Sequence, residues 1–406
     1  MIIYSHAKVV TCNDKDDILS DGFVAIENDR IAAVGKMSDL SSFPQFMDIP
    51  TIDAAGKTLI PGLVNAHVHL TMRRILGALM PRPDVATEAF NAVRALLGLL
   101  REGVTAVRDP GHDDHVHMQL RDVINNGVIF GPRMKVAGVA LGMSWGHAHF
   151  VVQQIHSHDE AVAEVRRQIS SGADFIKIIV SNEDVAGLKG DRISVPWFDG
   201  DTLKKCVEIA HQCGLPVAVH ASGSEAIDMV IDAGVNCIEH AIRLTREQAR
   251  KMKDRNIFYV PTISGSCENT DPKWGRGSAW RERFVRLWSY HVESVSNAIK
   301  EGVVIATGTD TLGKVPDEMN HFTKAGMTNY DAVKAATFNG AKVMEMENHI
   351  GSLEAGKFAD MVMLNGDPLV DLNALNCIEQ VVKAGTPISM GELQKFMPYS
   401  PQFALE

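Results

Sequence analysis

Two histidines separated by one residue, His67-Val68-His69, close a short apolar run near the start of the chain. Side chains two positions apart on a β-strand point to the same face, so both imidazoles could bind one ion. The pair could equally be two exposed histidines beside a strand end. Taken alone, the pattern leaves both interpretations open, and a metal site would need partners elsewhere in the chain.

Three further ionisable side chains follow apolar runs in the same way. His220 and His240 each end a short apolar segment, and Asp310 ends another. Each of them could be a hydrogen-bonded residue of the core or the rim. If the segments converge, four histidines and one aspartate meet at one point. Imidazole nitrogen with carboxylate oxygen suits Zn²⁺, Mn²⁺ or Fe²⁺ better than Mg²⁺ or Ca²⁺.

Lys177 lies in the middle of an apolar segment, Phe175-Ile176-Lys177-Ile178-Ile179-Val180. A buried and unpaired ammonium group is costly. The side chain could extend to a carboxylate or to solvent. Alternatively, reaction with CO₂ could convert it to a carbamate, an anion able to bridge two cations. We favour the carbamate because the sequence also contains the His67/His69 pair and two further histidines at predicted strand ends.

The middle of the chain has the elements needed to bring these side chains together. Short apolar segments alternate with helical stretches such as 160–170 and 201–212, which predicts parallel strands. Eight such units match an α/β fold of the (β/α)8 TIM-barrel type, whose strands carry the active site at their carboxyl ends. No GxGxxG motif follows the first segment, which weakens the alternative of an open dinucleotide-binding sheet. The predicted strands are 63–70, 104–110, 134–139, 175–181, 216–222, 237–242, 258–264 and 303–310.

Both ends of the chain have a different pattern of short strands and tight turns. Asn28-Asp29-Arg30 predicts a hairpin turn. We therefore expect a small β-sandwich domain built from both termini. The predicted boundaries are 1–61 for its N-terminal part, 62–352 for the barrel, and 353–406 for its C-terminal part and tail.

The composition of the 406 residues excludes several classes of protein. A net charge of −10 opposes nonspecific binding of nucleic acid. No run approaches the ~18 apolar residues of a membrane-spanning helix. Six cysteines without a CxxC pair do not indicate a disulfide framework. We expect a cytoplasmic homo-oligomer acting on a small molecule, with no membrane or nucleic-acid partner.

The ordered set of motifs resembles the amidohydrolase superfamily. The resemblance rests on Leu59-Ile60-Pro61-Gly62-Leu63-Val64-Asn65-Ala66-His67-Val68-His69, followed by Lys177, His220, His240 and Thr309-Asp310. The segment from Gly351 to Asp360 is similar to the terminal sheet domain of that family. The resemblance covers almost the whole chain.

This resemblance implies a centre of two divalent metal ions, for which we expect zinc. It places His67, His69 and Asp310 on one ion and His220 and His240 on the other. N-carboxylated Lys177 and a hydroxide would bridge the ions. We then expect Asp310 to take the proton of the hydroxide and deliver it to the leaving amine.

Within the superfamily, Gly131-Pro132-Arg133 and Trp145-Gly146-His147 are similar to metal-dependent Xaa-Pro dipeptidases and carboxypeptidase-like relatives. This sequence departs from the pattern of those dipeptidases at two places. A Gly-His-Gly-Asp-like stretch is replaced by Gly146-His147-Ala148-His149, and an aromatic residue that is often present is replaced by Ser222. Both places fall among the expected substrate contacts. They bear on the identity of the substrate rather than on the metal set.

The expected substrate contacts are His147, Trp145, Ser222 and Arg243, with His147 holding a carbonyl oxygen or a carboxylate. The segment 267–283 looks like a lid. The remaining histidines of the expected loops are interpreted as solvated rather than as a further metal site: 112, 115, 117, 149, 156 and 158.

The sequence thus predicts hydrolysis of an amide bond, in a dipeptide or an N-acyl amino acid. The same centre could instead hydrolyse an aryl urea, a carbamate or a lactone. A deaminase is disfavoured because such relatives usually use one metal and lack a lysine in the fourth predicted strand, where this chain has Lys177. A non-catalytic scaffold is disfavoured because all six expected ligands are present.

Overall fold

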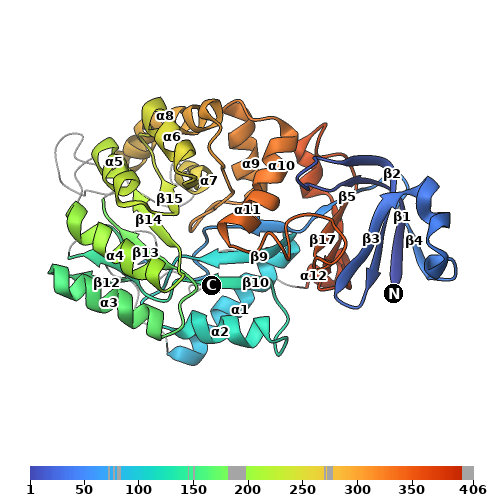
Figure 1. Ribbon diagram of the computed structural model, residues 1–406, viewed down its shortest axis with the longest axis horizontal. Helices are drawn as coiled ribbons and strands as arrows, with labels where there is room; N and C mark the ends of the chain where they lie inside the picture. The colour runs from blue at the N-terminus through green and yellow to red at the C-terminus, as the bar shows by residue number, and fades with distance from the viewer. Residues whose placement is uncertain are drawn as a thin grey trace.

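The computed structural model describes residues 1–71, 74–75, 78–79, 84–144, 146–149, 151–181, 198–268, 271 and 278–395. Figure 1 shows a larger part, in which helices surround strands, and a smaller part at one end, where the N-terminal strands gather. The expected substrate contact Trp145 and the centre of the expected lid lie outside the described residues.

The smaller part is an eight-stranded sheet to which both ends of the chain contribute. Its strands are β1 (Ile2–Val10), β2 (Ile18–Glu27), β3 (Arg30–Lys36), β4 (Thr51–Asp53), β5 (Thr58–Pro61), β17 (Met361–Leu364), β18 (Ile378–Lys383) and β19 (Thr386–Ser389). They are ordered β19-β18-β17-β5-β1-β2-β3, and β4 pairs with β1. Strands β17 and β5 are antiparallel, with Met361 opposite Pro61.

The terminal sheet is curved. Register shifts in β1 between Tyr4 and Ala7, and between Ala7 and Val9, bend this strand. The Tyr4 hydroxyl donates to Oε1 of Gln380 on β18 at 2.5 Å, although β5 and β17 lie between the two strands. The described strands therefore wrap an apolar core as a sandwich does, but within one continuous sheet.

The hairpin predicted at Asn28-Asp29-Arg30 is confirmed between β2 and β3, with Arg30 already the first residue of β3. Glu27 lies opposite Arg30, which leaves a two-residue turn. Asn28 has a φ of 55°, a left-handed conformation that asparagine tolerates and that tight hairpin turns require.

Parallel strands form the centre of the larger part. One sheet contains β6 (Leu63–Asn65), β9 (Val104–Asp109) and β10 (Arg133–Val136). The other contains β11 (Ala140–Met143), β12 (Val152–Ile155), β13 (Ile176–Ile179), β14 (Val217–Ala221), β15 (Cys237–His240) and β16 (Phe258–Val260). Seven of the eight predicted segments overlap one of these strands, whereas β11 and β12 were not predicted. A separate small hairpin pairs β7 (Arg74–Ile75) with β8 (Ala78–Leu79).

The predicted eighth strand, 303–310, forms isolated bridges instead of a continuous ladder. Tyr259 pairs with Ile305 and Val68 pairs with Asp310, so this segment lies between β16 and the chain after β6. A Cβ atom at Gly308 would lie 2.5 Å from Val260 Cγ1, which shows how closely the backbone approaches its neighbours. Asp310 has a φ of 55°, which ends the extended conformation. Among the described strands, ladder pairing therefore stops short of a closed eight-stranded barrel.

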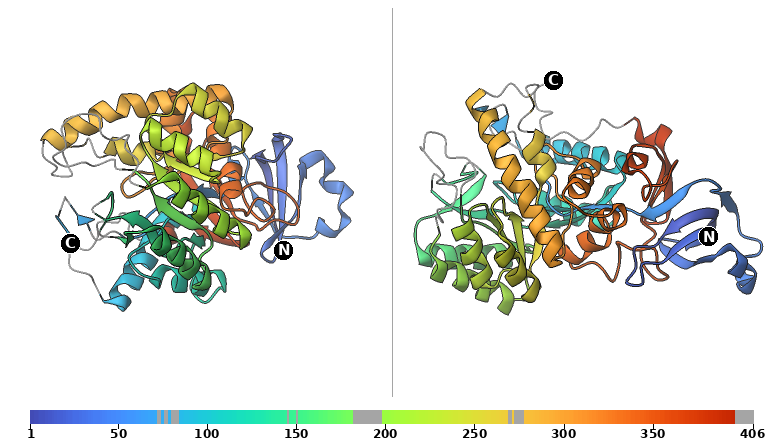
Figure 2. Two further views of the ribbon diagram at one scale, coloured as in Figure 1. Left: turned by 60° about the vertical axis from the view of Figure 1, so that its left-hand side comes forward. Right: turned by 90° about the horizontal axis from the view of Figure 1, so that it is seen from above.

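Helices cover the outside of the parallel strands (Figure 2). Helix α3 shows the pattern: its buried Ala161, Val165 and Gln168 are spaced by three and four residues. Across the described residues, no helix combines the length and apolar character needed to cross a bilayer. The α-helices are α1 (Val85–Arg101), α2 (Val116–Asn125), α3 (His158–Ser170), α4 (Gly200–Gln212), α5 (Ser224–Ala233), α6 (Arg246–Asp254), α7 (Ile263–Glu268), α8 (Ser278–Glu301), α9 (Val315–Lys324), α10 (Asn329–Ala335), α11 (Phe338–Val343) and α12 (Met390–Leu393). The 3-10 helices are η1 (Met37–Ser42), η2 (Pro44–Phe46) and η5 (Leu372–Asn376).

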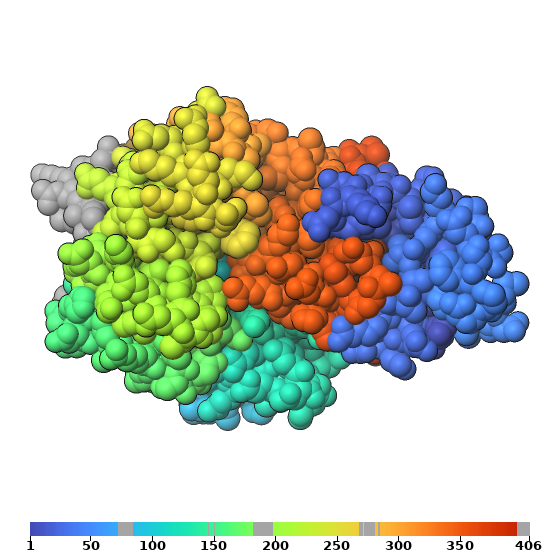
Figure 3. Space-filling view, in the orientation of Figure 1, coloured from blue at the N-terminus to red at the C-terminus, as the bar shows by residue number. Residues whose placement is uncertain are grey.

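A buried ion pair joins the two parts. Nε of Arg133, at the start of β10, donates to Oδ2 of Asp360 at 2.8 Å. The same guanidinium lies 3.5 Å from the centre of the Phe358 ring. Lys383 of β18 also approaches Asp360, at 3.4 Å. Figure 3 accordingly shows residues from the C-terminal third of the chain, in orange, between the blue N-terminal part and the green strand–helix units.

Candidate functional site

The predicted ligands lie where the parallel strands end. His220 in β14 is opposite Ile179 of β13, and His240 at the end of β15 is opposite Ala221. Asp310 is paired with Val68, the residue between His67 and His69. We call these residues the strand-end cluster: His67, His69, Lys177, His220, His240 and Asp310.

Distances show that this cluster is compact. One ligand atom each from His67, His69 and Asp310 lies within 4.8 Å of the others. The His67 ring centre is 5.0 Å from that of His240, which is in turn 4.5 Å from that of His220. The four histidines are therefore brought together as predicted. His67, His69 and Asp310 form a set that could hold a metal ion.

Burial keeps the imidazoles of His67, His220 and His240 neutral. Burial, together with nearby Lys177, lowers the pKa of His67 to about 4. Burial also lowers the pKa values of His220 and His240 well below the ordinary histidine value. A neutral imidazole offers a lone pair to a cation, so the cluster has the donor chemistry of a metal site at neutral pH.

Hydrogen bonds on one ring nitrogen orient three of the histidines. Nδ1 of His67 is 2.6 Å from Oε2 of Glu239, and Nδ1 of His240 is 2.6 Å from Oγ1 of Thr262. Nδ1 of His69 donates to the carbonyl oxygen of Gly111 at 3.0 Å. Such partners on one nitrogen leave Nε2 as the metal-binding atom, which is the usual arrangement around bound metals.

Glu239 and Arg108 are functional candidates that the sequence analysis missed. Both are buried, and the Arg108 guanidinium is 2.5 Å from Oε1 of Glu239. Glu239 then holds His67 through its other oxygen. In a regular strand, Glu239 and His240 would point to opposite faces, but His240 has a φ of 68° and leaves that alternation. Charged side chains inside two apolar strands were the signal that could have found this pair.

Lys177 is only 3% exposed. Its Nζ atom is buried without a hydrogen-bond partner among the described residues. Burial lowers its pKa, which favours the neutral amine. An unsatisfied nitrogen beside four histidines and a carboxylate fits a centre for divalent cations, because such a centre would give this side chain a role and a partner.

The expected substrate contacts are placed unequally. The ring of His147 stacks on that of His220, with centres 4.5 Å apart, so His147 belongs to the site. Ser222 is buried, and its amide donates to Oγ of Ser181 at 2.9 Å. The Arg243 guanidinium lies 4.6 Å from the centre of the Tyr290 ring on α8. The backbone amide of Arg243 donates to the carbonyl of Ser222.

The interpretation of His112 and His117 as solvated loop residues is wrong. They are 2% and 1% exposed. Nε2 of His112 lies 3.0 Å from Oε1 of buried Glu88, and Nε2 of His117 lies 3.6 Å from the same oxygen. We call Glu88, His112 and His117 the helix-side cluster. Glu88, which both histidines approach, is supplied by α1.

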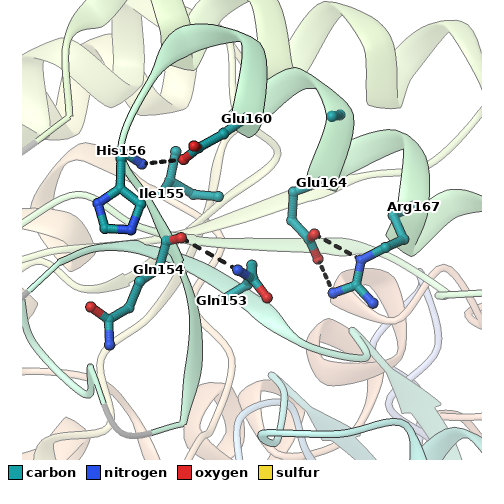
Figure 4. A pocket seen from close by; sticks show the side chains of 8 residues that line it. Gln153, Gln154, Ile155, His156, Glu160, Glu164 and Arg167 are labelled. Atoms are coloured by element: carbon teal, nitrogen blue, oxygen red, sulfur yellow. Dashed lines mark hydrogen bonds and ion pairs between the residues drawn. The ribbon is translucent and has the colours of Figure 1, made fainter.

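A surface pocket of about 320 Å³ lies between β12 and α3 (Figure 4). Its polar groups are already paired: the amide of His156 donates to Glu160 at 2.7 Å, and Arg167 contacts Glu164 at 2.8 Å. None of the residues that line it was predicted to bind metal or substrate.

Residues 58–388 match the amidohydrolase family, and the chain therefore belongs to it. It is a hydrolase of this family, as the sequence motifs predicted. It is 27% identical to ochratoxinase from Aspergillus niger over 392 residues, which cover 87% of this chain and 79% of the relative.

Two solved structures show the same likeness. A Xaa-Pro dipeptidase with methionine bound in its active site matches with a TM-score of 0.83 and 27% identity, over 96% of this chain and 99% of that chain. A putative prolidase from Bifidobacterium longum matches with a TM-score of 0.82 and 26% identity, over 99% of this chain and 96% of that chain. These likenesses agree with a fold of the TIM-barrel type.

Proposed function

We propose that the protein is a binuclear metal hydrolase that cleaves an amide bond of a dipeptide or an N-acyl amino acid. The observation that carries this proposal is the convergence of three buried histidines, the partly exposed His69 and Asp310, and a buried lysine whose Nζ has no hydrogen-bond partner among the described residues. A dipeptidase among the relatives, and the methionine bound in its active site, support a substrate that contains an amino acid.

In this proposal, His67, His69 and Asp310 would hold one ion, and His220 and His240 would hold the other. The neutral amine of Lys177 would add to CO₂ with formation of an N–C bond and loss of one proton, and the resulting carbamate would supply anionic oxygens to the ions. When bound, two zinc ions supply an activated water and polarise the carbonyl group.

The side chains of the protein perform the remaining steps. The carboxylate of Asp310 accepts a proton and passes it to the leaving amine nitrogen. His147, stacked on His220, donates a hydrogen bond to the substrate carbonyl or carboxylate. Trp145, Ser222 and Arg243 are proposed to shape the space that the substrate occupies.

A substrate panel with the zinc-loaded protein tests this proposal. The panel contains Xaa-Xaa dipeptides, N-acyl amino acids, aryl ureas, carbamates and lactones, with metal content measured on the same sample. We expect turnover of the amides and at least two equivalents of zinc per chain. Turnover confined to ureas or lactones would contradict the substrate, and a strand-end cluster without zinc would contradict the centre.

We also propose a cytoplasmic location. None of the six cysteines, all of which are described, forms a disulfide, and Cys12, Cys206 and Cys237 lie in the interior, as a reducing compartment would keep them. Fractionation of cells followed by immunoblotting measures this directly, and recovery with the secreted proteins would contradict it.

A further inference from the structure

The helix-side cluster is a second group of metal-competent side chains, separate from the strand-end cluster. Glu88 comes from α1, His112 from the loop after β9, and His117 from α2. One ligand atom from each lies within 4.8 Å of the others, and all three residues are buried. The rings of the two histidines are 4.6 Å apart between their centres.

Carboxylates orient both histidines. Nδ1 of His117 is 2.8 Å from Oδ2 of Asp109. Nδ1 of His112 is 3.0 Å from Oδ1 of Asp113 and 3.3 Å from Oδ1 of Asp114. Both Nε2 atoms consequently face Glu88. A carboxylate behind each histidine is the arrangement that commonly fixes metal-binding imidazoles.

The buried Nε2 atom of His112 is directed at Glu88. It lies 3.0 Å from Oε1 of Glu88, an ion-pair contact whose geometry does not meet that of a hydrogen bond. The hydroxyl of Thr71 hydrogen-bonds to Oε1 of Glu88 and lies 3.3 Å from Nε2 of His117. Two nitrogens and one carboxylate oxygen thus surround a common point, and a hydroxyl or a water could provide a fourth ligand.

We propose that Glu88, His112 and His117 bind a zinc ion that is distinct from the catalytic centre. Two imidazole nitrogens with one carboxylate oxygen suit zinc. All three residues are closed off from solvent, as in structural zinc sites, whereas the set of His67, His69 and Asp310 is partly open.

The ion would stabilise the loop that positions a catalytic ligand. Oδ1 of Asp109 accepts the amide of Gly111 at 3.0 Å, and the carbonyl of Gly111 accepts Nδ1 of His69 at 3.0 Å. Asp109 also holds His117. An ion on His117 would therefore fix the chain from 109 to 117 and, through it, the ring of His69. This is a positioning role, not a catalytic one.

Zinc stoichiometry of the full chain tests the site. The protein is stripped with a chelator, reloaded with zinc and analysed by mass spectrometry, as wild type, H117N and H115N. His115 lies in the same loop but contacts Gln168 instead of the cluster, which makes H115N a matched control. We expect three equivalents in wild type and H115N, and two in H117N, with a lower melting temperature for H117N alone. Equal zinc content in H117N and H115N would overturn the proposal.

Anomalous scattering at the zinc edge, measured on crystals of the loaded wild type, locates the ion even if H117N does not fold. We expect a peak between Glu88, His112 and His117, and its absence would overturn the proposal. Failure of the proposed catalytic centre gives a different result: wild type and H220N would each retain one ion, which H117N would lose.

Discussion

The strand-end and helix-side clusters both gather buried histidines, but their surroundings differ. In the strand-end cluster, rings contact other rings and a lysine, and burial lowers the pKa of His67 to about 4. In the helix-side cluster, burial also opposes the charged form, but Asp113, Asp114 and Glu88 outweigh it and raise the pKa of His112 to about 11. The neighbours, and not the residue type, therefore decide how strongly a histidine holds a proton.

The two clusters also differ in their access to solvent. His69 and Asp310 are partly exposed, whereas every member of the helix-side cluster is buried. A catalytic metal site must keep a position open for substrate, and a structural site need not. The comparison thus assigns chemistry to one cluster and stabilisation to the other.

Exchanging one histidine in each cluster gives the largest expected effect. H220N should lower kcat/KM by about 10³-fold or more, because the metal centre stabilises the transition state by several kcal/mol. H117N should keep activity within about tenfold of wild type while losing thermal stability. Kinetics, circular dichroism and melting curves on both variants measure this contrast. Equal losses of activity in two folded variants would remove the distinction between the clusters.

Lys177→Ala tests whether the strand-end cluster needs an anion in its interior. We expect activity to fall by about 10²-fold or more, with the fold retained, because a bridging ligand between the ions is lost. A short-chain carboxylate such as propionate should restore part of the activity by supplying a substitute anion. Full turnover without added acid would contradict the bridging carbamate.

Glu239→Gln tests whether the orientation of His67 by Glu239 contributes to metal binding, because it leaves His67 itself in place. The variant should bind zinc about 10–100-fold more weakly at the strand-end cluster, since His67 loses its carboxylate partner. It should also lose about 3 kcal/mol of unfolding free energy, because buried Arg108 loses its counter-charge. Competition with a chromogenic chelator and urea denaturation give the two quantities.

The control for this change is Glu247→Gln, an exposed glutamate on α6 whose side chain is 77% exposed. It should alter neither quantity measurably. If Glu239→Gln behaved like this control, Glu239 would have no role in holding His67.

Glu318→Gln extends the comparison to buried carboxylates. The histidines beside Glu88 outweigh its burial and lower its pKa. Glu318 instead accepts hydrogen bonds from uncharged groups, among them the amides of Ile263 and Ser264, and burial raises its pKa to about 8. Folded protein therefore holds more protons on Glu318 than unfolded protein between about pH 4.5 and 8. Stability should fall across this window by up to about 1.4 kcal/mol per pH unit.

Urea denaturation of wild type and Glu318→Gln from pH 5 to pH 8 measures the slope. The variant should lack the part of the decline that Glu318 causes. Identical slopes for the two proteins would show that Glu318 does not titrate in this range.

The strand-end cluster could be predicted because each ligand ends an apolar segment, and parallel strands share one active edge. His67, His220 and His240 could therefore be grouped without knowing any distance. Arg108 and Glu239 could each be noticed as a charge within an apolar strand, but they could not be paired. The contact between an arginine on β9 and a glutamate on β15 depends on how the two sheets that hold these strands are placed.

The helix-side cluster was missed for a related reason. A local pattern of histidines and aspartates at 112–117 is typical of a solvated loop, and only Glu88 on α1 makes it a closed site. The sequence predicted a continuous eighth strand at 303–310, whereas the structure has isolated bridges there. The close approach at Gly308 and the left-handed backbone at Asp310 depend on neighbours that periodicity does not reveal.

The pairing of β5 with β17 has a consequence for biosynthesis. Pro61 and Met361 meet in one ladder, so β5 is synthesised long before its partner leaves the ribosome. Until then, one edge of the N-terminal strands has no partner and can pair with another chain. The last three strands complete the sheet at the end of translation, and an exchange of these strands between two nascent chains is the misassembly to which this topology is most exposed.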